Sequence, residues 1–166
     1  MIEFKPAHGG TEGTWAWLAV DGGLAVGVLT VDRTPADHDV AGYDEHATIK
    51  YVFSAAQEPG IGRKLLAHAK SELLRMNLTL YGSGVATCRG RRALASQDIE
   101  ISPATKYKWA NRERQIQKWD LLAPRNRTTP RPAEPQRDLD SKKAREDGER
   151  ALKAVAAMLD IRSIIG

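Results

Sequence analysis

The stretch Gln57-Glu58-Pro59-Gly60-Ile61-Gly62 lies between an apolar run and an amphipathic helical pattern. The run from Ala47 to Ser54 is rich in β-branched and aromatic residues, as in a buried strand. From Arg63 to Asn77 the pattern is helical, with one apolar face that would pack on a sheet. That face consists of Ile61, Leu65, Leu66, Ala69, Leu73 and Met76. The sequence therefore predicts a strand, a glycine turn and a helix.

A glycine turn at the start of a helix is suited to binding phosphate. The first N–H groups of a helix lack intrahelical partners, and the helix dipole is positive there. Gly60 and Gly62 would let an anion approach these groups, with Arg63 and Lys64 beside it. A Walker loop would need G-K-[ST], and a Rossmann fingerprint would need G-x-G-x-x-G with an acidic residue about 20 positions on. Neither pattern occurs here.

In this context Q-x-x-G-x-G resembles motif A of the GCN5-related N-acetyltransferase (GNAT) family, whose loop binds the pyrophosphate of acetyl-coenzyme A (acetyl-CoA). The resemblance covers about residues 14–102 and implies an α/β (α+β) fold with a mixed, mostly antiparallel sheet flanked by helices. It also implies contacts to the co-substrate from the strand, where backbone groups meet the pantetheine arm, and from the glycine turn. The implied residues are Val52, Phe53, Ser54, Gln57, Gly60, Ile61, Gly62, Arg63 and Lys64.

The first third of the chain departs from the family pattern. A strand is expected at Ile2–Lys5, and Asp21-Gly22-Gly23 predicts a tight hairpin between strands at Trp15–Val20 and Leu24–Val31. The family places two helices before this hairpin, where they wall one side of the acceptor groove, and here there is no room for them. Either the acceptor site is open and suits a large substrate, or another segment or subunit completes it.

The segment after the long helix resembles motif B of the family, which is a strand, a short helix and a strand. Leu78–Tyr81 and Ile99–Ile101 are the strand candidates, and Thr87 can cap a helix running to Gln97. The family often places a tyrosine acid on this helix to protonate the departing thiolate. Ala95 stands at that position. Three arginines of the same helix either bind phosphate groups or lie on its solvent-exposed face: Arg89, Arg91 and Arg92.

Transfer of an acyl group to an amine requires a base and little covalent help from the protein, because the thioester is already reactive. Family members that resemble histone acetyltransferases carry a glutamate eleven positions before the motif glutamine, and counting back from Gln57 gives His46. A neutral imidazole can accept a proton near neutral pH. Glu45 is the alternative base. His46 can also be a polar residue at the edge of a strand, without a catalytic role. Tyr107 is a candidate acid, as is Tyr81, and either can instead be a packing aromatic.

Composition favours one enzyme-sized domain with an appendage. The chain has 166 residues, of which 42% are hydrophobic, and carries a net charge of +4. Its one cysteine, Cys88, cannot form an internal disulfide and is expected to be a reduced, buried residue rather than a nucleophile. Four scattered histidines show no metal-ligand spacing. Without an export signal or a long apolar run, a cytoplasmic location is expected.

Beyond residue 102 the sequence becomes basic. Residues 104–131 hold eight Lys and Arg against two acidic residues, interrupted by Trp109 and Trp119. This segment either binds nucleic acid or is a basic helix whose tryptophans pack on the sheet. We divide the chain into a GNAT-like domain (1–121), a Pro/Arg-rich linker (122–137) and a C-terminal helix (138–166). The apolar stripe of that helix would be buried on its own domain or on a second copy, giving a homodimer.

The sequence supports three functional hypotheses. The first is an acyl-CoA-dependent N-acyltransferase with acetyl-CoA as the default donor and an unknown amine as acceptor. The second is a nucleic-acid-binding or nucleic-acid-modifying protein on a GNAT scaffold. The third is a degenerate member that serves as a coenzyme A-binding interaction module. The small size and the basic tail look similar to bacteriophage or actinobacterial acyltransferases of unassigned substrate.

Overall fold

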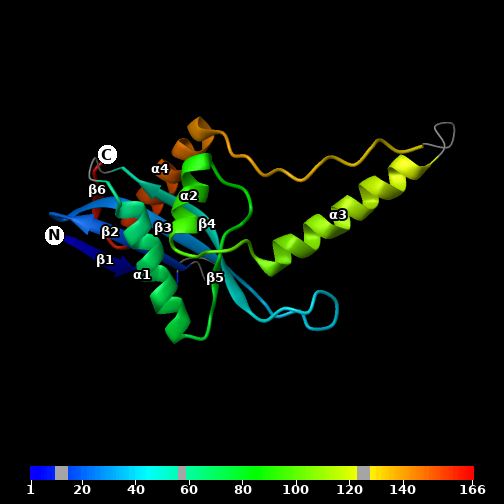
Figure 1. Cartoon of the computed structure of the whole chain (residues 1–166). Helices are drawn as coiled ribbons and strands as arrows, with labels where there is room; N and C mark the ends of the chain where they lie inside the picture. Colours follow the sequence, from blue (N-terminus) through cyan, green and yellow to red (C-terminus); the bar gives the residue numbers. More distant parts are fainter. Residues whose placement is uncertain (10–14, 56–58, 123–127) are drawn as a thin grey trace.

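The chain folds as one mainly antiparallel sheet with helices on both faces (Figure 1), which confirms the mixed α+β class. The computed structural model describes residues 1–9, 15–55, 59–122 and 128–166. The strands are β1 (Ile2–Pro6), β2 (Trp15–Asp21), β3 (Leu24–Thr34), β4 (His46–Ser54), β5 (Leu80–Tyr81) and β6 (Arg162–Ser163). The helices are α1 (Ile61–Arg75), α2 (Cys88–Ser96), α3 (Pro103–Leu121) and α4 (Ser141–Met158).

The strands follow the order β1-β2-β3-β4-β5, and β6 pairs with β3. The pairs β4–β5 and β3–β6 are parallel, and the others are antiparallel. The predicted hairpin joins β2 to β3 through Gly22 (φ 58°) and Gly23 (φ 81°). Positive φ at two successive residues is what a type I′ turn requires, and this turn matches the twist of the paired strands. The expected strand at Ile99–Ile101 is instead a single bridge between Ile101 and Gly82.

Helix α1 packs on one face of the sheet and forms the larger core with β2, β3 and β4. The buried residues of this core include Trp17, Leu29, Leu65 and Leu73. Gly27 of β3 allows the close approach, because a Cβ there would lie 3.0 Å from the Leu65 side chain. Burying each large apolar side chain stabilises the fold by roughly 1.5–3 kcal/mol. The predicted apolar face of α1 is buried except at Met76, which is 40% exposed as the residue that ends the helix.

Helix α4 covers the opposite face of the sheet, where it forms the second core with β2 and β3. Leu152 is fully buried, and Val155 packs beside it against Leu18 and Val28. The apolar stripe of α4 thus lies on its own sheet, one of the two placements considered above. The helix ends at Met158 rather than near residue 165, because the chain turns through Asp160 (φ 52°) and continues into β6.

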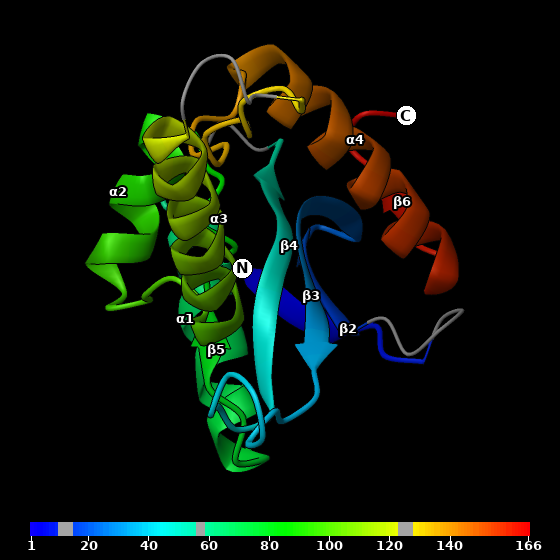
Figure 2. The same cartoon turned by 90° about the vertical axis from the view of Figure 1, so that its right-hand side faces the viewer.

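Helix α3 projects away from the sheet, and residues 128–140 return alongside it to α4 (Figure 1). Figure 2 views the molecule from the side on which this helix projects. The expectation that the tryptophans of this segment pack on the sheet was wrong. Trp109 lies against the loop at Gly84, where a Cβ would come within 2.6 Å of the ring. Trp119 donates its indole N–H to the Thr129 carbonyl at 2.9 Å. No helix in the described part of the chain is long and apolar enough to cross a membrane.

Gly148 is the point at which α4 approaches the sheet most closely, and it gives a prediction about stability. A Cβ at this position would lie 2.6 Å from Cβ and Cγ of Phe53, whereas a Cβ at Gly62 would meet nothing within 4 Å. Alanine normally gains about 1 kcal/mol over glycine within a helix. We expect Gly148→Ala to reverse this sign and to destabilise the protein by about 1–3 kcal/mol through overpacking.

Chemical denaturation without ligand measures both variants. The matched control Gly62→Ala changes the same residue type within a helix and should be neutral or stabilising. A Gly148→Ala protein as stable as wild type would mean that α4 packs less closely than described here.

Candidate functional site

The start of α1 is an open helix N-terminus. Its cap residue Gly60 has a left-handed conformation (φ 90°) and provides no side-chain cap, and the first turn contains no acidic residue. Gly62 has open space where a side chain would begin. The Ile61 side chain is 1% exposed and fixes the turn to the core, while Arg63 and Lys64 are exposed. Gln57 lies outside the described residues. The turn therefore has the geometry and the charge to accept an anion on backbone N–H groups.

The second part of the site is a cleft beside β4. Strand β4 pairs with β5 only at Ala47–Leu80 and Thr48–Tyr81, and β4 continues to Ser54 without β5 beside it. A cleft of about 290 Å³ opens there, and β4 lines it from Ile49 to Val52. An unpaired strand edge offers N–H and C=O groups that can hydrogen-bond an extended ligand. The cleft thus suits a narrow ligand that carries amide groups.

A β-bulge at Lys50 changes which way β4 directs its side chains. Tyr51 lies opposite Thr30 and Ile49 lies opposite Val31, so Lys50 has no partner in the register with β3. A bulge re-aims the following side chains and is common next to active sites. Of the three strand positions proposed for the pantetheine arm, Val52 lines the cleft, Phe53 packs against Gly148, and Ser54 lies opposite Gly27.

Helix α4 forms a wall of the cleft that sequence reasoning did not place there. Lys143, Asp147 and Gly148 of α4 line it, together with Gln136 from the returning segment. The Asp147 side chain is 20% exposed and lies 3.3 Å from the Arg150 guanidinium. The available sequence signal was the glycine within a helical pattern, which costs stability unless another backbone or ligand approaches. A segment of the chain itself therefore forms one wall of the cleft.

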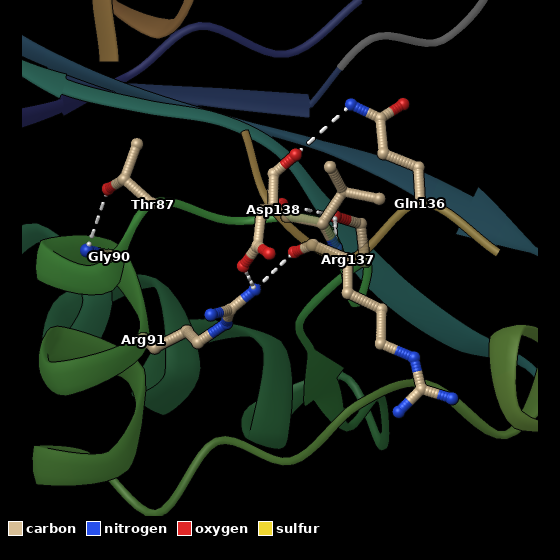
Figure 3. Close-up of polar contacts among 8 residues, drawn as sticks. Thr87, Gly90, Arg91, Gln136, Arg137 and Asp138 are labelled. Carbon is tan, nitrogen blue, oxygen red and sulfur yellow. Dashed lines mark hydrogen bonds and ion pairs between the residues drawn. The ribbon is translucent and has the colours of Figure 1, made fainter. Parts of the chain in front are cut away.

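The start of α2 is joined to the segment before α4 (Figure 3). Arg91 donates hydrogen bonds to the Arg137 carbonyl and to the Asp138 carboxylate, and Thr87 caps α2 by accepting from the N–H of Gly90 at 3.0 Å. Ala86 adds a backbone bridge to the same segment. Arg91 is thus held within the protein, although the sequence allowed a phosphate-binding role for it.

Two neighbouring arginines remain available at this end of α2. Arg89 and Arg92 line an open hollow of about 480 Å³. Cys88 also lines it, and its side chain is exposed, so the expectation of a buried cysteine was wrong. Cys88 is the first residue of α2, a position that faces solvent rather than the core. No group of three His, Cys, Asp or Glu side chains among the described residues is arranged to hold a metal ion.

His46 is 2% exposed at the start of β4. Nδ1 lies 2.9 Å from the Asp44 carbonyl, which can only accept, so Nδ1 carries the proton and Nε2 is the acceptor. Nε2 is buried without a hydrogen-bond partner among the described residues. The rings of Tyr43 and Tyr81 stand edge-on to the imidazole at 5.2 Å each. Ile49, the first cleft residue of β4, lies three positions further along the strand, about 10 Å away.

The other two candidate catalytic residues lie elsewhere. Glu45 is exposed, and it accepts a hydrogen bond of 2.7 Å from the Arg33 guanidinium. Tyr107 is half-buried on the projecting helix α3, and it is not among the residues that line the cleft. The structure thus brings His46 and Val52 onto one strand that leads toward the α1 turn, and it does not bring Tyr107 to the cleft.

The chain was compared with known families, curated proteins and solved structures. No protein-family model matches the chain, and no curated protein matches its sequence. One similar solved structure is the crystal structure of a predicted acetyltransferase with acetyl-CoA from Clostridium acetobutylicum. The two chains are 13% identical with a TM-score of 0.44, and the match covers 54% of this chain and 59% of that chain. The match thus spans less than two thirds of that protein, and none of these comparisons bears on a bacteriophage or actinobacterial origin.

Proposed function

We propose that the protein is an acyl-CoA-dependent N-acyltransferase, with acetyl-CoA as the default donor. The observation that carries this proposal is the unpaired edge of β4, which runs from the cleft toward the open N-terminus of α1. Coenzyme A has matching chemistry, because a pyrophosphate is joined to a narrow arm that contains two amides. The residues present fit the co-substrate: no acid lies in the first turn of α1, and Gly62 leaves room for close approach.

One set of residues would bind the co-substrate, and another residue would remove the proton from the amine. The backbone from Gly60 to Gly62, with Arg63 and Lys64 beside it, would hold the pyrophosphate, and the edge at Val52 would pair with the arm. The acceptor nitrogen bonds to the acyl carbon, the carbon–sulfur bond breaks, and coenzyme A leaves as a thiolate that takes a proton from water. We propose His46 as the group that takes the amine proton on Nε2, through water, because its ring does not line the cleft. The acceptor remains an amine of unspecified structure.

A thermal-shift titration tests the binding step. A ligand that binds only the folded protein stabilises it by about 2.7 kcal/mol at 100 times its Kd. For a chain of this size we expect acetyl-CoA to raise Tm by roughly 5–10 °C. ADP at the same concentration is the control, because it carries a pyrophosphate without the pantetheine arm. An unchanged Tm with acetyl-CoA, or an equal shift with ADP, would contradict the proposed site.

A second assay separates an enzyme from a binding module. Thiol release from acetyl-CoA can be followed with a disulfide reagent across a panel of small amines and lysine peptides. Acceptor-dependent release supports transfer. Binding without release for any acceptor would leave the protein as a coenzyme A-binding module.

A further inference from the structure

Helix α3 and residues 128–140 form a two-layer structure, which we call the arm. Ile116 is the one buried residue of α3, at 5% exposure. The Trp119 indole donates to Thr129, and the Arg137 guanidinium lies 4.5 Å from the centre of the Trp109 ring. Arg112 donates to the Ala133 carbonyl at 3.2 Å. Both tryptophans of the arm are therefore engaged in holding its two layers together.

The same packing places both carboxylates of α3 in ion pairs and leaves part of its basic side chains outside them. Glu113 pairs with Arg137 at 3.4 Å, and Asp120 pairs with Arg131 at 3.1 Å, so both carboxylates of α3 are neutralised by the returning segment. The hydrogen bond with Asp120 raises the pKa of the Arg131 guanidinium above its ordinary value. Arg112 is bonded to the returning segment. The other four basic side chains of α3 are exposed and form no ion pair within the described ranges: Lys106, Lys108, Arg114 and Lys118. We call these four residues the outer basic set.

We infer that the outer basic set binds the phosphates of duplex nucleic acid without reading its sequence. A helix of 19 residues is about 28 Å long, which is enough to follow several phosphates of one groove. Cations without acidic neighbours neutralise phosphates and release counterions, and this supplies most of sequence-independent binding. The projection of the arm from the sheet makes this surface accessible (Figure 1).

The structure favours duplex over other polyanions. Proteins that bind single strands stack bases on exposed aromatic rings, but Trp109 and Trp119 are occupied by the returning segment. Helices that lie on anionic membranes need an apolar face beside the basic one. The large hydrophobic residues exposed on α3 and its cap are confined to Leu121 and Leu122 at the far end.

Fluorescence anisotropy with a labelled duplex of about 20 base pairs tests the inference on the full chain. With four phosphate contacts the slope of log K against log salt should be about −3.6, so affinity should fall roughly fifty-fold between about 50 and 150 mM salt. We expect the variant K106S/K108S/R114S/K118S to lose most of this slope. These substitutions are on the surface and should leave the protein folded, which circular dichroism can check.

The matched control removes four positive charges from exposed sites outside the arm: Arg75, Lys142, Arg145 and Lys153. This variant should retain the slope of the wild-type protein. An equal loss in both variants would show that net charge alone attracts the duplex and would overturn the inference. Tighter binding of a single strand of the same length, or the absence of salt-dependent duplex binding at about 50 mM salt, would also overturn it.

Discussion

Gly62→Glu is expected to weaken acetyl-CoA binding by at least about 100-fold without unfolding the protein. A carboxylate about 4 Å from a bound phosphate costs about 4 kcal/mol at an effective dielectric constant of 20. The fold should tolerate the change, because a side chain at Gly62 meets nothing within 4 Å. A negative charge in the first turn of a helix also stabilises it by about 0.3–1 kcal/mol. Tm without ligand should thus hold or rise while the acetyl-CoA shift disappears.

Ser71→Glu is the matched control for this variant. It adds the same charge to an exposed position of α1, away from the first turn, and should leave the affinity for acetyl-CoA within about two-fold, since exposed charges more than about 10 Å apart are largely screened. A folded Gly62→Glu protein with wild-type affinity would mean that the α1 turn does not hold the pyrophosphate. The outcome is measured by isothermal titration, so it does not depend on identifying the acceptor.

The sheet and α1 could be predicted because their residues carry strong local signals. Runs of apolar, β-branched and aromatic residues predicted the strands, and Asp21-Gly22-Gly23 predicted the hairpin, in which both glycines have positive φ. Asn77, Asp98 and Asp160 lie two positions after the last residues of α1, α2 and α4, each at φ between 52° and 58°. Asn and Asp tolerate this left-handed conformation better than most residues. The hairpin signal depends on two neighbouring residues, and it predicted the turn. The left-handed residue after α4 was not predicted, so this helix was expected to continue to residue 165.

The arm could not be predicted, because its second layer has no periodicity of its own. Residues 128–140 are extended and rich in proline, a composition that reads as a solvated linker. They are placed by contacts to α3, such as the indole of Trp119 on Thr129 and the pair Glu113–Arg137. Those contacts join residues 10 and 24 positions apart. A tryptophan in a basic helix is equally compatible with packing on a sheet, which was one of the two alternatives that the sequence left open.

The cleft was predicted only in part for a similar reason. The resemblance to motif A implied a contact between Val52 and the co-substrate, and Val52 lines the cleft, but the bulge at Lys50 has no sequence signature. Asp147 and Lys143 enter the cleft through the docking of α4, which depends on how the whole apolar stripe meets the sheet. Side chains brought together by tertiary docking cannot be grouped from spacing in a single sequence.

His46 can be either a core histidine or the base, and its burial bears on the choice. A buried acceptor without a partner costs about 1–3 kcal/mol, so such groups in folded proteins usually have a reason. Nε2 is in this state, while Nδ1 is fixed by the Asp44 carbonyl. The neutral ring therefore carries its proton on Nδ1. The lone pair of Nε2 is free to accept a proton, as a general base requires. Glu45, in contrast, is exposed and already paired with Arg33.

We expect His46→Gln and His46→Ala to lower kcat by about 10² or more, which is the usual contribution of a general base. The affinity for acetyl-CoA should change by less than about two-fold, because His46 does not line the cleft. Two variants are needed, since the alanine removes a buried ring and also costs stability, whereas glutamine keeps most of the volume but cannot act as a base. Glu45→Gln is the control and should retain wild-type kcat. If kcat falls only in Glu45→Gln, the base is Glu45. If kcat is unchanged in a folded His46→Gln protein, His46 is a core residue that packs between Tyr43 and Tyr81.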